Sequence, residues 1–389
     1  MSMNKKVRVA EYILPGHPDK LCDAIADALV QQASGREKRA LAGVEVAVHR
    51  NRVFVTGRLA CADAEEIDVA QTARDIYRTA GYDTNWPPGP SELQVTTDLC
   101  LGPLLDGEAQ FRAVADDQSI ITGYAVDIPG TNYLPPEHWL AWRLARGLQR
   151  LRSERSDLEL GPDGKLIVFL QTDSSGCSRL VEFSASLQQL VAASEIDLHR
   201  AVLEFLASEL SKAAEAIPGF EPVAPEKVLI NGAGNFAVGG PEGDNGLSGK
   251  KLVVDAYGPR VPIGGGALCG KDFYKADRAG AIIARRLAKA VVMTGAAREC
   301  TATVAFLPGA EQACVVSLRN GDGDELDSAR WAALIDLSLQ GAGDRYTGAT
   351  DLVEIARNGH FTSYARPWEG ISFNDSGCPQ PALQTSAYA

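Results

Sequence analysis

Long helical segments and short hairpin-like segments are mixed along this chain, and this mixture constrains its fold more than any other feature. In four segments the apolar residues recur every three or four positions, the period of an amphipathic helix. The first follows His17-Pro18, and proline is favoured in the first turn of a helix. The predicted helices cover residues 18–33, 136–151, 195–215 and 278–293.

Shorter segments between these helices have the two-residue period of half-buried strands. Residues 44–48 and 53–57 flank a polar connection and predict an antiparallel hairpin. Because hairpins and helices are mixed rather than strictly alternating, the pattern favours an α+β fold with mixed or antiparallel sheets over a parallel βαβ sheet. Further strands are predicted at 165–172, 251–257, 301–307 and 313–318.

Three α+β units fit a chain of 389 residues. The irregular stretch 101–116 and the proline-containing stretch 217–227 are the expected seams. The polar segment after Gly370 is expected to be loosely held. The predicted domains are 5–105, 115–230 and 231–375, the last of which contains two glycine-rich loops.

Charge and composition exclude several classes of function. The formal net charge of −12 argues against a general electrostatic grip on nucleic acid or on anionic lipid, although local basic pockets remain possible. No run approaches the roughly 18 apolar residues of a membrane span, and no secretory leader is recognisable, so a cytoplasmic location is expected. The eight cysteines have no CxxC pair and are expected to be reduced, mostly buried thiols.

Three segments combine charged residues with glycine or with a helix start. Gly16-His17-Pro18-Asp19-Lys20 opens the first helix, where free N–H groups favour anions and Asp19 could hold a hard cation. Residues 231–251 hold seven of the 38 glycines and end in Lys250-Lys251, but they contain neither GxxxxGK[ST] nor GxGxxG. Alone, the first is more simply a capped helix start, and the second is as well explained by a turn-rich connection.

The segment 264–278, with sequence GGGALCGKDFYKADR, carries the stronger signal. Three cations and two carboxylates lie within eight residues beside three successive glycines, which suits a polyphosphate bridged by Mg²⁺. Asp116-Asp117-Gln118 with Gly123-Tyr124-Ala125, and Pro162-Asp163-Gly164-Lys165, are most simply loops when each is considered singly.

In this order the segments resemble the S-adenosylmethionine synthetases (methionine adenosyltransferases). The matching motifs are GHPDK at 16–20, DDQ and GYA at 116–125, PDGK at 162–165, GGPEGDNGLSGKK at 239–251, GGGALCGKDFYKADR at 264–278, GHF at 359–361 and PWE at 367–369. The resemblance implies three similar α+β domains in a pseudo-threefold arrangement, and a homodimer or dimer of dimers with active sites between subunits. It also implies transfer of the adenosyl group of ATP to methionine, release of pyrophosphate and phosphate, and use of Mg²⁺ and K⁺.

The resemblance also implies roles for particular residues. His17, Lys20 and Lys271 would act at the leaving triphosphate, Asp19 and Asp277 would bind Mg²⁺, and Glu45 falls at a K⁺-linked position. Asp117, Asp163, Lys165 and Phe236 would line the adenosine side, and Lys250 and Lys251 the phosphates. Asp244 and Lys275 would meet both nucleotide and amino acid. A thioether is already a nucleophile, so the chemistry needs alignment and stabilisation of charge on the leaving oxygen, which a histidine donor at His17 could supply.

The amino-acid side departs from the family pattern. Arg58 stands where the family carries a glutamate that binds the methionine ammonium, and the family's loop glutamine has no clear counterpart in 98–111, where Cys100 is the nearest candidate. Lys250 replaces a family arginine, which keeps the charge but loses bidentate geometry. Either Arg58 turns away and methionine is used, or the acceptor is a different nucleophile.

Two further hypotheses belong to other classes. One is a non-catalytic relative that binds nucleotide or a catalytic paralogue as a regulatory subunit, although retention of His17, Asp19, Lys271 and Asp277 counts against it. The other is hydrolysis of nucleotide or triphosphate without transfer.

Overall fold

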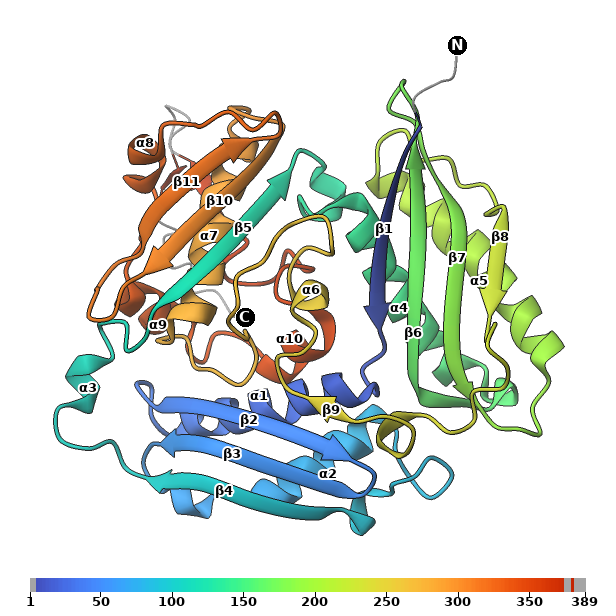
Figure 1. Cartoon of the computed structure of the whole chain (residues 1–389), viewed down its shortest axis with the longest axis horizontal. Coiled ribbons are helices and arrows are strands. Elements are labelled where there is room, and N and C mark those ends of the chain that lie inside the picture. Colours follow the sequence, from blue (N-terminus) through green and yellow to red (C-terminus); the bar gives the residue numbers. More distant parts are fainter. Residues whose placement is uncertain (1–4, 374–378, 381–389) are drawn as a thin grey trace, which may run out of the picture.

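Three β-sheets, each covered by helices on one face, form the frame of the protein (Figure 1). The computed structural model describes residues 5–373 and 379–380. In the view of Figure 1 the helices lie behind the sheets, and the segments around α6 and α10 fill the space between them. The mixed α+β architecture predicted from the sequence is confirmed.

The first sheet has the strand order β4-β3-β2-β9. Strands β2 and β3 form the predicted hairpin, β4 runs parallel to β3, and β9 pairs with β2. Helices α1 and α2 cover one face, and the other face leaves Glu45 and Phe54 exposed. The bounds are α1 Pro18–Arg36, β2 Leu41–His49, β3 Arg52–Ala60, α2 Val69–Ala80, β4 Gln94–Gly102 and β9 Gly246–Leu247.

The second sheet has the order β1-β6-β7-β8, with α4 and α5 packed behind it. Strand β6 contains the Pro162-Asp163-Gly164-Lys165 segment near its start, so this motif belongs to a strand rather than to the loop expected from its sequence alone. The bounds are β1 Lys6–Ile13, α4 Pro136–Glu154, β6 Leu160–Thr172, β7 Ser178–Gln189, α5 Glu195–Ala216 and β8 Lys227–Ile230.

The third sheet has the order β11-β10-β5, and α7 packs on β5 and β10. The GYA motif at 123–125 lies within β5, where a Cβ on Gly123 would meet the Ala284 carbonyl oxygen of α7 at 2.1 Å. The helix can therefore approach the sheet closely only because residue 123 is glycine. The bounds are β5 Ser119–Val126, α7 Ala276–Met293, β10 Glu299–Phe306 and β11 Cys314–Asn320.

Shorter elements connect the sheets. The α-helical ones are α3 Glu108–Phe111, α6 Leu252–Asp255, α8 Ser328–Ala332, α9 Leu339–Tyr346 and α10 Leu352–Asn358. The 3-10 turns are η1 Ala64–Glu66, η2 Pro90–Glu92, η3 Pro129–Thr131, η4 Ser156–Leu158 and η5 Gly240–Glu242. Strands β12 Ser372–Phe373 and β13 Pro379–Gln380 form a separate pair, and most of the segment expected to be loosely held lies outside the described residues.

The four predicted helices are confirmed as α1, α4, α5 and α7, and three predicted strands are confirmed within β6, β10 and β11. The strand predicted at 251–257 is wrong, because this segment contains α6. A short apolar run such as Leu252-Val253-Val254 does not distinguish strand from helix. The helical turn directs Asp255 into the interior, where it is paired with Lys20.

The sheets exchange strands along the chain. Strand β1 joins β6, β5 joins β10, and β9 joins β2, so the first sheet contains a strand from residues 246–247. The ranges 5–105, 115–230 and 231–375 are therefore not the ranges of the sheets, and as domain boundaries they remain a prediction. This exchange brings the glycine-rich segment 231–251 to the edge of the first sheet.

Helix α1 lies in the interior, and its residues from Pro18 to Val30 are buried although several are charged. The seven described cysteines are free, and four of them are buried: Cys22, Cys61, Cys269 and Cys300. Cys378 lies outside the described residues. Among the helices that the structure describes, none combines the length and the apolar character needed to cross a bilayer.

Candidate functional site

The first group of predicted residues shares a cavity of about 330 Å³. This volume lies at the lower end of the range typical of small-molecule sites. The cavity lies where the start of α1, the start of β6 and the segment 231–244 meet. Its lining includes five predicted residues: His17, Asp163, Lys165, Phe236 and Asp244.

Close backbone packing fixes the walls of this first cavity. A Cβ on Gly16 would lie 2.3 Å from the carbonyl oxygen of Pro162, so the start of α1 can approach β6 only with glycine at this position. Asp163 Oδ2 accepts a hydrogen bond of 2.7 Å from the Gly240 N–H. Burial raises the pKa of Asp163 to about 6, although the N–H donors and Lys165 oppose this shift.

His17 caps α1 and borders the first cavity. Its Nδ1 accepts a hydrogen bond of 3.2 Å from the Asp19 N–H. Burial lowers the pKa of His17 to about 4; the Asp19 carboxylate opposes this shift, and Lys251 and Lys165 add to it. The imidazole is therefore neutral at pH 7, and because Nδ1 accepts, Nε2 carries the proton. His17 is thus a hydrogen-bond donor at Nε2.

Asp19 connects α1 to the end of the first glycine-rich segment. Its carboxylate lies 2.9 Å from Lys251 Nζ and 3.6 Å from Lys250 Nζ, and it accepts the Leu247 N–H at 3.0 Å. Burial favours the protonated form, but the Lys251 ammonium and the Leu247 N–H outweigh it, so the pKa of Asp19 is lowered. The two predicted phosphate lysines therefore converge on one ionised carboxylate.

The second group of predicted residues lines another cavity, of about 340 Å³. Lys271 Nζ lies 2.5 Å from Asp277 Oδ2, Lys275 is paired with Asp116, and Ser119 Oγ donates to Asp277. A Cβ on Gly266 would overlap the Asp277 carboxylate, so one of the three successive glycines is needed for close packing. The lining residues are Gly43, Asp116, Asp117, Gln118, Lys271, Lys275, Ala276 and Asp277.

Within one chain the predicted residues form two groups rather than one. Among the described residues the two cavities share no lining residue. Asp117, expected on the adenosine side with Asp163, lines the second cavity, and Lys275 lies there while Asp244 lies in the first. The expectation that these residues surround a single ligand is not met inside one copy of the chain.

Lys20 is placed differently from its expected position. Its side chain is fully buried, 3.0 Å from Asp23 Oδ2 and in contact with Asp255, and it lines neither cavity. Burial disfavours its charge, but the two carboxylates outweigh this effect and raise the pKa of Lys20 well above its usual value. Lys20 is therefore an internal counter-charge in this structure, and its role at the leaving group stays a prediction.

Arg58 lies beside the second cavity. In the sheet register it is opposite Gly43, a residue of that cavity, and also opposite Cys100. Its guanidinium Nη2 lies 2.7 Å from Glu108 Oε2, and Glu108 also accepts the Leu105 N–H at 2.7 Å. The cation at position 58 is therefore matched by a carboxylate from the segment that follows β4.

Carboxylates available for a metal occur in both groups. Asp277 faces the second cavity, Asp19 adjoins the first, and carboxylate oxygens are the ligands Mg²⁺ prefers. Each carboxylate is paired with a lysine. A polyphosphate would bind the lysine and leave the carboxylate free for the metal, so these residues fit a polyphosphate that carries a metal ion. Glu45 is exposed and accepts a hydrogen bond of 2.5 Å from Ser248 Oγ, and its link to K⁺ stays a prediction.

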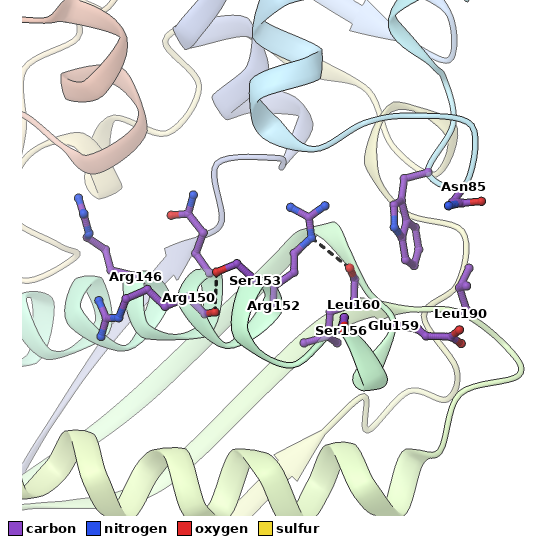
Figure 2. A pocket seen from close by; sticks show the side chains of 11 residues that line it. Asn85, Arg146, Arg150, Arg152, Ser153, Ser156, Glu159, Leu160 and Leu190 are labelled. Atoms are coloured by element: carbon purple, nitrogen blue, oxygen red, sulfur yellow. Dashed lines mark hydrogen bonds between the residues drawn. The ribbon is translucent and has the colours of Figure 1, made fainter.

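A larger cavity, of about 710 Å³, lies along α4 and contains none of the predicted residues (Figure 2). Three arginines line it, but each has a partner in the chain. Arg146 lies 3.6 Å from Glu354, Arg150 lies 3.2 Å from Glu209, and Arg152 donates to three backbone carbonyls. These arginines hold elements together, and we do not assign the candidate site here.

Sequence reasoning assigned no role to several residues that shape the site, although it quoted Asp116 within the DDQ motif. Asp116 pairs with Lys275, and Ser119 donates a hydrogen bond to Asp277. Glu108 accepts a hydrogen bond from Arg58. The contacts of Asp116, Ser119 and Glu108 span 159, 158 and 50 positions in sequence, so no local pattern predicts them. Asp23 and Asp27 did have a signal, since with Asp19 they recur every four residues on α1.

Comparisons with known proteins find related sequences and a related structure. The family model for the N-terminal domain of S-adenosylmethionine synthetase matches residues 5–97, and the model for its C-terminal domain matches residues 238–370. An S-adenosylmethionine synthase of Hyphomonas neptunium is 30% identical over 346 residues, covering 85% of this chain and 86% of that protein. One from Rhodospirillum centenum is 31% identical over 315 residues, covering 79% of each chain. A solved structure of an unusual S-adenosylmethionine synthetase from Campylobacter jejuni superimposes with a TM-score of 0.81 at 24% identity, covering 94% of this chain and 97% of that one.

Proposed function

Because the chain belongs to the S-adenosylmethionine synthetase family, we propose that it transfers the adenosyl group of ATP to methionine and releases pyrophosphate and phosphate. The observation that carries this proposal is the pairing of lysines with carboxylates, Lys251 with Asp19 beside the first cavity and Lys271 with Asp277 in the second. Such pairs suit a ligand that brings both phosphates and a divalent cation.

The chain's own groups fit the chemistry of displacement at C5′. A lone pair of the methionine sulfur forms the S–C5′ bond as the C5′–O bond breaks, and the tripolyphosphate leaves with that electron pair. Charge grows on the leaving oxygen, where the neutral His17 ring can donate its Nε2–H without giving up a proton. Water then cleaves the tripolyphosphate to pyrophosphate and phosphate.

The two cavities divide the remaining tasks. Asp163, Lys165 and Phe236 would hold the adenosine, and Lys250, Lys251 and Lys271 the phosphates. Mg²⁺, held by Asp19 and Asp277, would neutralise polyphosphate charge when bound. K⁺ would bind near Glu45.

We infer that two copies of the chain form each complete site. His17 and Asp277 lie in cavities that share no described lining residue, while the reaction needs both at one triphosphate. A homodimer in which the first cavity of one copy meets the second cavity of its partner satisfies this need. The open face of the β4-β3-β2-β9 sheet, next to both cavities, is where we place the second copy.

The Arg58–Glu108 pair supports methionine as the acceptor. An unpaired arginine at the acceptor end would repel the methionine ammonium, but Glu108 lies at hydrogen-bond distance and balances that charge. Adenosylation of a different nucleophile, one with a carboxylate directed at Arg58, is the second candidate, and it requires Glu108 to move away.

The test is product identification. The protein is mixed with ATP, Mg²⁺, K⁺ and a pool of acceptors containing methionine, and adenosylated products are identified by mass spectrometry. We expect S-adenosylmethionine, formed with phosphate release and formed about 10²- to 10³-fold more slowly by the His17→Ala variant. Phosphate release indifferent to every acceptor would favour hydrolysis alone. No turnover, with intact binding of nucleotide or of a catalytic paralogue, would favour the regulatory role.

A further inference from the structure

Three aspartates on one stripe of α1 each accept a backbone N–H from a glycine-rich segment. Asp19 Oδ1 accepts from Leu247 at 3.0 Å, Asp23 Oδ1 from Gly249 at 2.8 Å, and Asp27 Oδ1 from Gly270 at 2.8 Å. The aspartates are spaced by four residues, so they lie one above another on the same face of the helix. All three are at most 1% exposed.

The two glycines bound in this way immediately precede two groups of lysines, one that pairs with Asp19 beside the first cavity and one in the lining of the second. Gly249 precedes Lys250-Lys251, and Gly270 precedes Lys271. Both glycines have positive φ, +69° and +78°, a conformation that side chains disfavour. An added Cβ would lie 2.5 Å from the Ala267 side chain at Gly249, and 2.2 Å from the Val44 carbonyl oxygen at Gly270. The backbone before each lysine is therefore held at one position.

Buried cations occupy the second oxygen of two of these aspartates. Asp23 Oδ2 lies 3.0 Å from Lys20, and Asp27 Oδ2 lies 2.5 Å from Arg278. The aspartates are thus fixed from both sides, which suits a rigid spacer better than a mobile contact.

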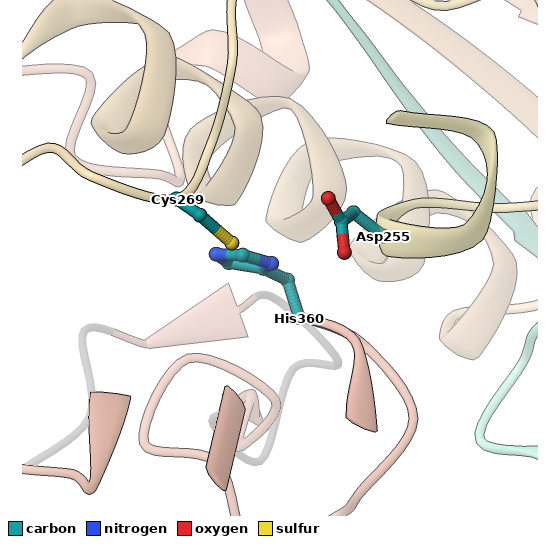
Figure 3. A group of neighbouring side chains, drawn as sticks. All are labelled: Asp255, Cys269 and His360. Carbon is teal, nitrogen blue, oxygen red and sulfur yellow. The ribbon is translucent and has the colours of Figure 1, made fainter. Parts of the chain in front are cut away.

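Asp255, Cys269 and His360 form a buried cluster that contacts the cations of this arrangement (Figure 3). Asp255 is paired with Lys20, and His360 Nε2 lies 3.2 Å from Arg278. Because these cations contact two of its three members, we read the cluster as support for the aspartates rather than as a metal site.

We propose that Asp23 and Asp27 are positioning residues that set the two lysine groups at a fixed spacing along α1. Neither side chain lines a cavity among the described residues, so both act through the glycines they hold. This inference goes beyond the proposed function and rests on it only for the identity of the phosphate ligand. Asp23 holds the glycine that precedes Lys250 and Lys251, which pair with Asp19 beside the first cavity, and Asp27 holds the glycine that precedes Lys271 of the second cavity.

Asparagine and alanine variants separate positioning from simple charge pairing. Asparagine keeps an oxygen that can accept the glycine N–H but removes the charge that faces Lys20 or Arg278. Alanine removes both. A positioning role therefore predicts that Asp23→Asn and Asp27→Asn bind tripolyphosphate nearly as the parent does, although both melt at lower temperature.

The experiment measures binding of Mg²⁺-tripolyphosphate by calorimetry, and the melting temperature, for the full chain. For Asp23→Ala and Asp27→Ala we expect affinity to fall about tenfold or more, because each loses a charge-assisted hydrogen bond that orders a lysine loop. The Asn variants should stay within about threefold of the parent, since the acceptor oxygen remains. Glu369→Gln and Glu369→Ala are matched controls, because Glu369 is buried and ion-paired with Arg285 and Lys289 but contacts neither glycine loop.

The outcomes separate this inference from the proposed function. Asparagine variants that bind tripolyphosphate nearly as the parent does, but melt at a lower temperature, support the positioning role. This holds even if the parent transfers no adenosyl group. The Glu369 variants show how much a lower melting temperature alone changes the affinity for Mg²⁺-tripolyphosphate. An Asn variant whose affinity falls together with its melting temperature overturns the inference. If the alanine variants do not fold, the Asn variants decide alone by the same criterion. A parent that binds no tripolyphosphate overturns both the inference and the proposed function.

Discussion

The two cavities differ in the burial and the charge of the side chains that face a ligand. The first contains a neutral histidine and a carboxyl group with a raised pKa, both nearly buried and fixed by backbone hydrogen bonds. The second contains lysine–aspartate pairs that are more exposed and are held by side chains alone. The first is therefore suited to recognise shape and donate hydrogen bonds, and the second to exchange its internal ion pairs for phosphate and metal.

The largest expected effect tests the donor role in the first cavity. His17→Ala should lower kcat by about 10²- to 10³-fold, because loss of one preorganised donor to a developing oxyanion costs about 3 kcal/mol. The KM for ATP should change little, since the leaving oxygen gains its charge only in the transition state. A rise in KM with unchanged kcat would mean that His17 only binds substrate.

Removal of the second cavity's ammonium should have a somewhat smaller effect. Lys271→Ala should lower kcat/KM by about 10²-fold, since a phosphate loses one charge-assisted contact and Asp277 is left without its partner. Lys271→Arg keeps the charge and should recover part of the loss. An alanine variant with parental kcat/KM would remove Lys271 from the phosphate site.

Asp163 predicts a pH dependence that belongs to the first cavity. Its pKa of about 6 lies above the usual value, so the carboxyl group becomes protonated as the pH falls through 6, whereas His17, with a pKa of about 4, stays neutral there. We expect kcat/KM for ATP to fall towards tenfold per pH unit below 6, as for one essential ionised group. Asp163→Asn should abolish this acid limb, and its persistence in that variant would assign the limb to another group.

The same two groups have opposite effects on stability. The folded protein holds a proton on Asp163 that the unfolded chain has lost, so this group's contribution to stability falls as the pH rises from about 4 to about 6. The pKa of His17 in the folded protein, about 4, lies below its value of 6.5 in the unfolded chain. The contribution of His17 to stability therefore rises as the pH increases from about 4 to about 6.5. Melting curves of Asp163→Asn and His17→Gln across this range should therefore differ from the parent in opposite directions.

The smallest expected effect concerns the Arg58–Glu108 pair beside the second cavity. Glu108→Gln leaves Arg58 unbalanced and should raise the KM for methionine by about three- to tenfold, in line with roughly 1 kcal/mol for a partly exposed pair. The KM for ATP should not change. Arg58→Glu should improve methionine use, and if neither variant alters the KM for methionine, the pair does not face the acceptor.

Comparison of sequence and structure shows which features local patterns can predict. The helices follow from apolar spacing, and the charged glycine-rich segments identified both lysine groups, because these signals lie within a few residues. The pairing of Lys20 with Asp255 could not be predicted from local spacing, because Asp255 is 235 positions distant. The division into two cavities depends on how β1, β5 and β9 join distant strands, and no local pattern contains that information.

The most direct test of the account is complementation between two inactive chains. His17→Ala and Lys271→Ala chains, carrying different affinity tags, are co-expressed, and dimers containing one of each are purified over both tags. One of their two composite sites then has an intact first cavity from one copy and an intact second cavity from the other. We predict about half of the parental turnover per dimer, as follows from a twofold-symmetric assembly. Mixed dimers as inactive as either variant alone would contradict the account.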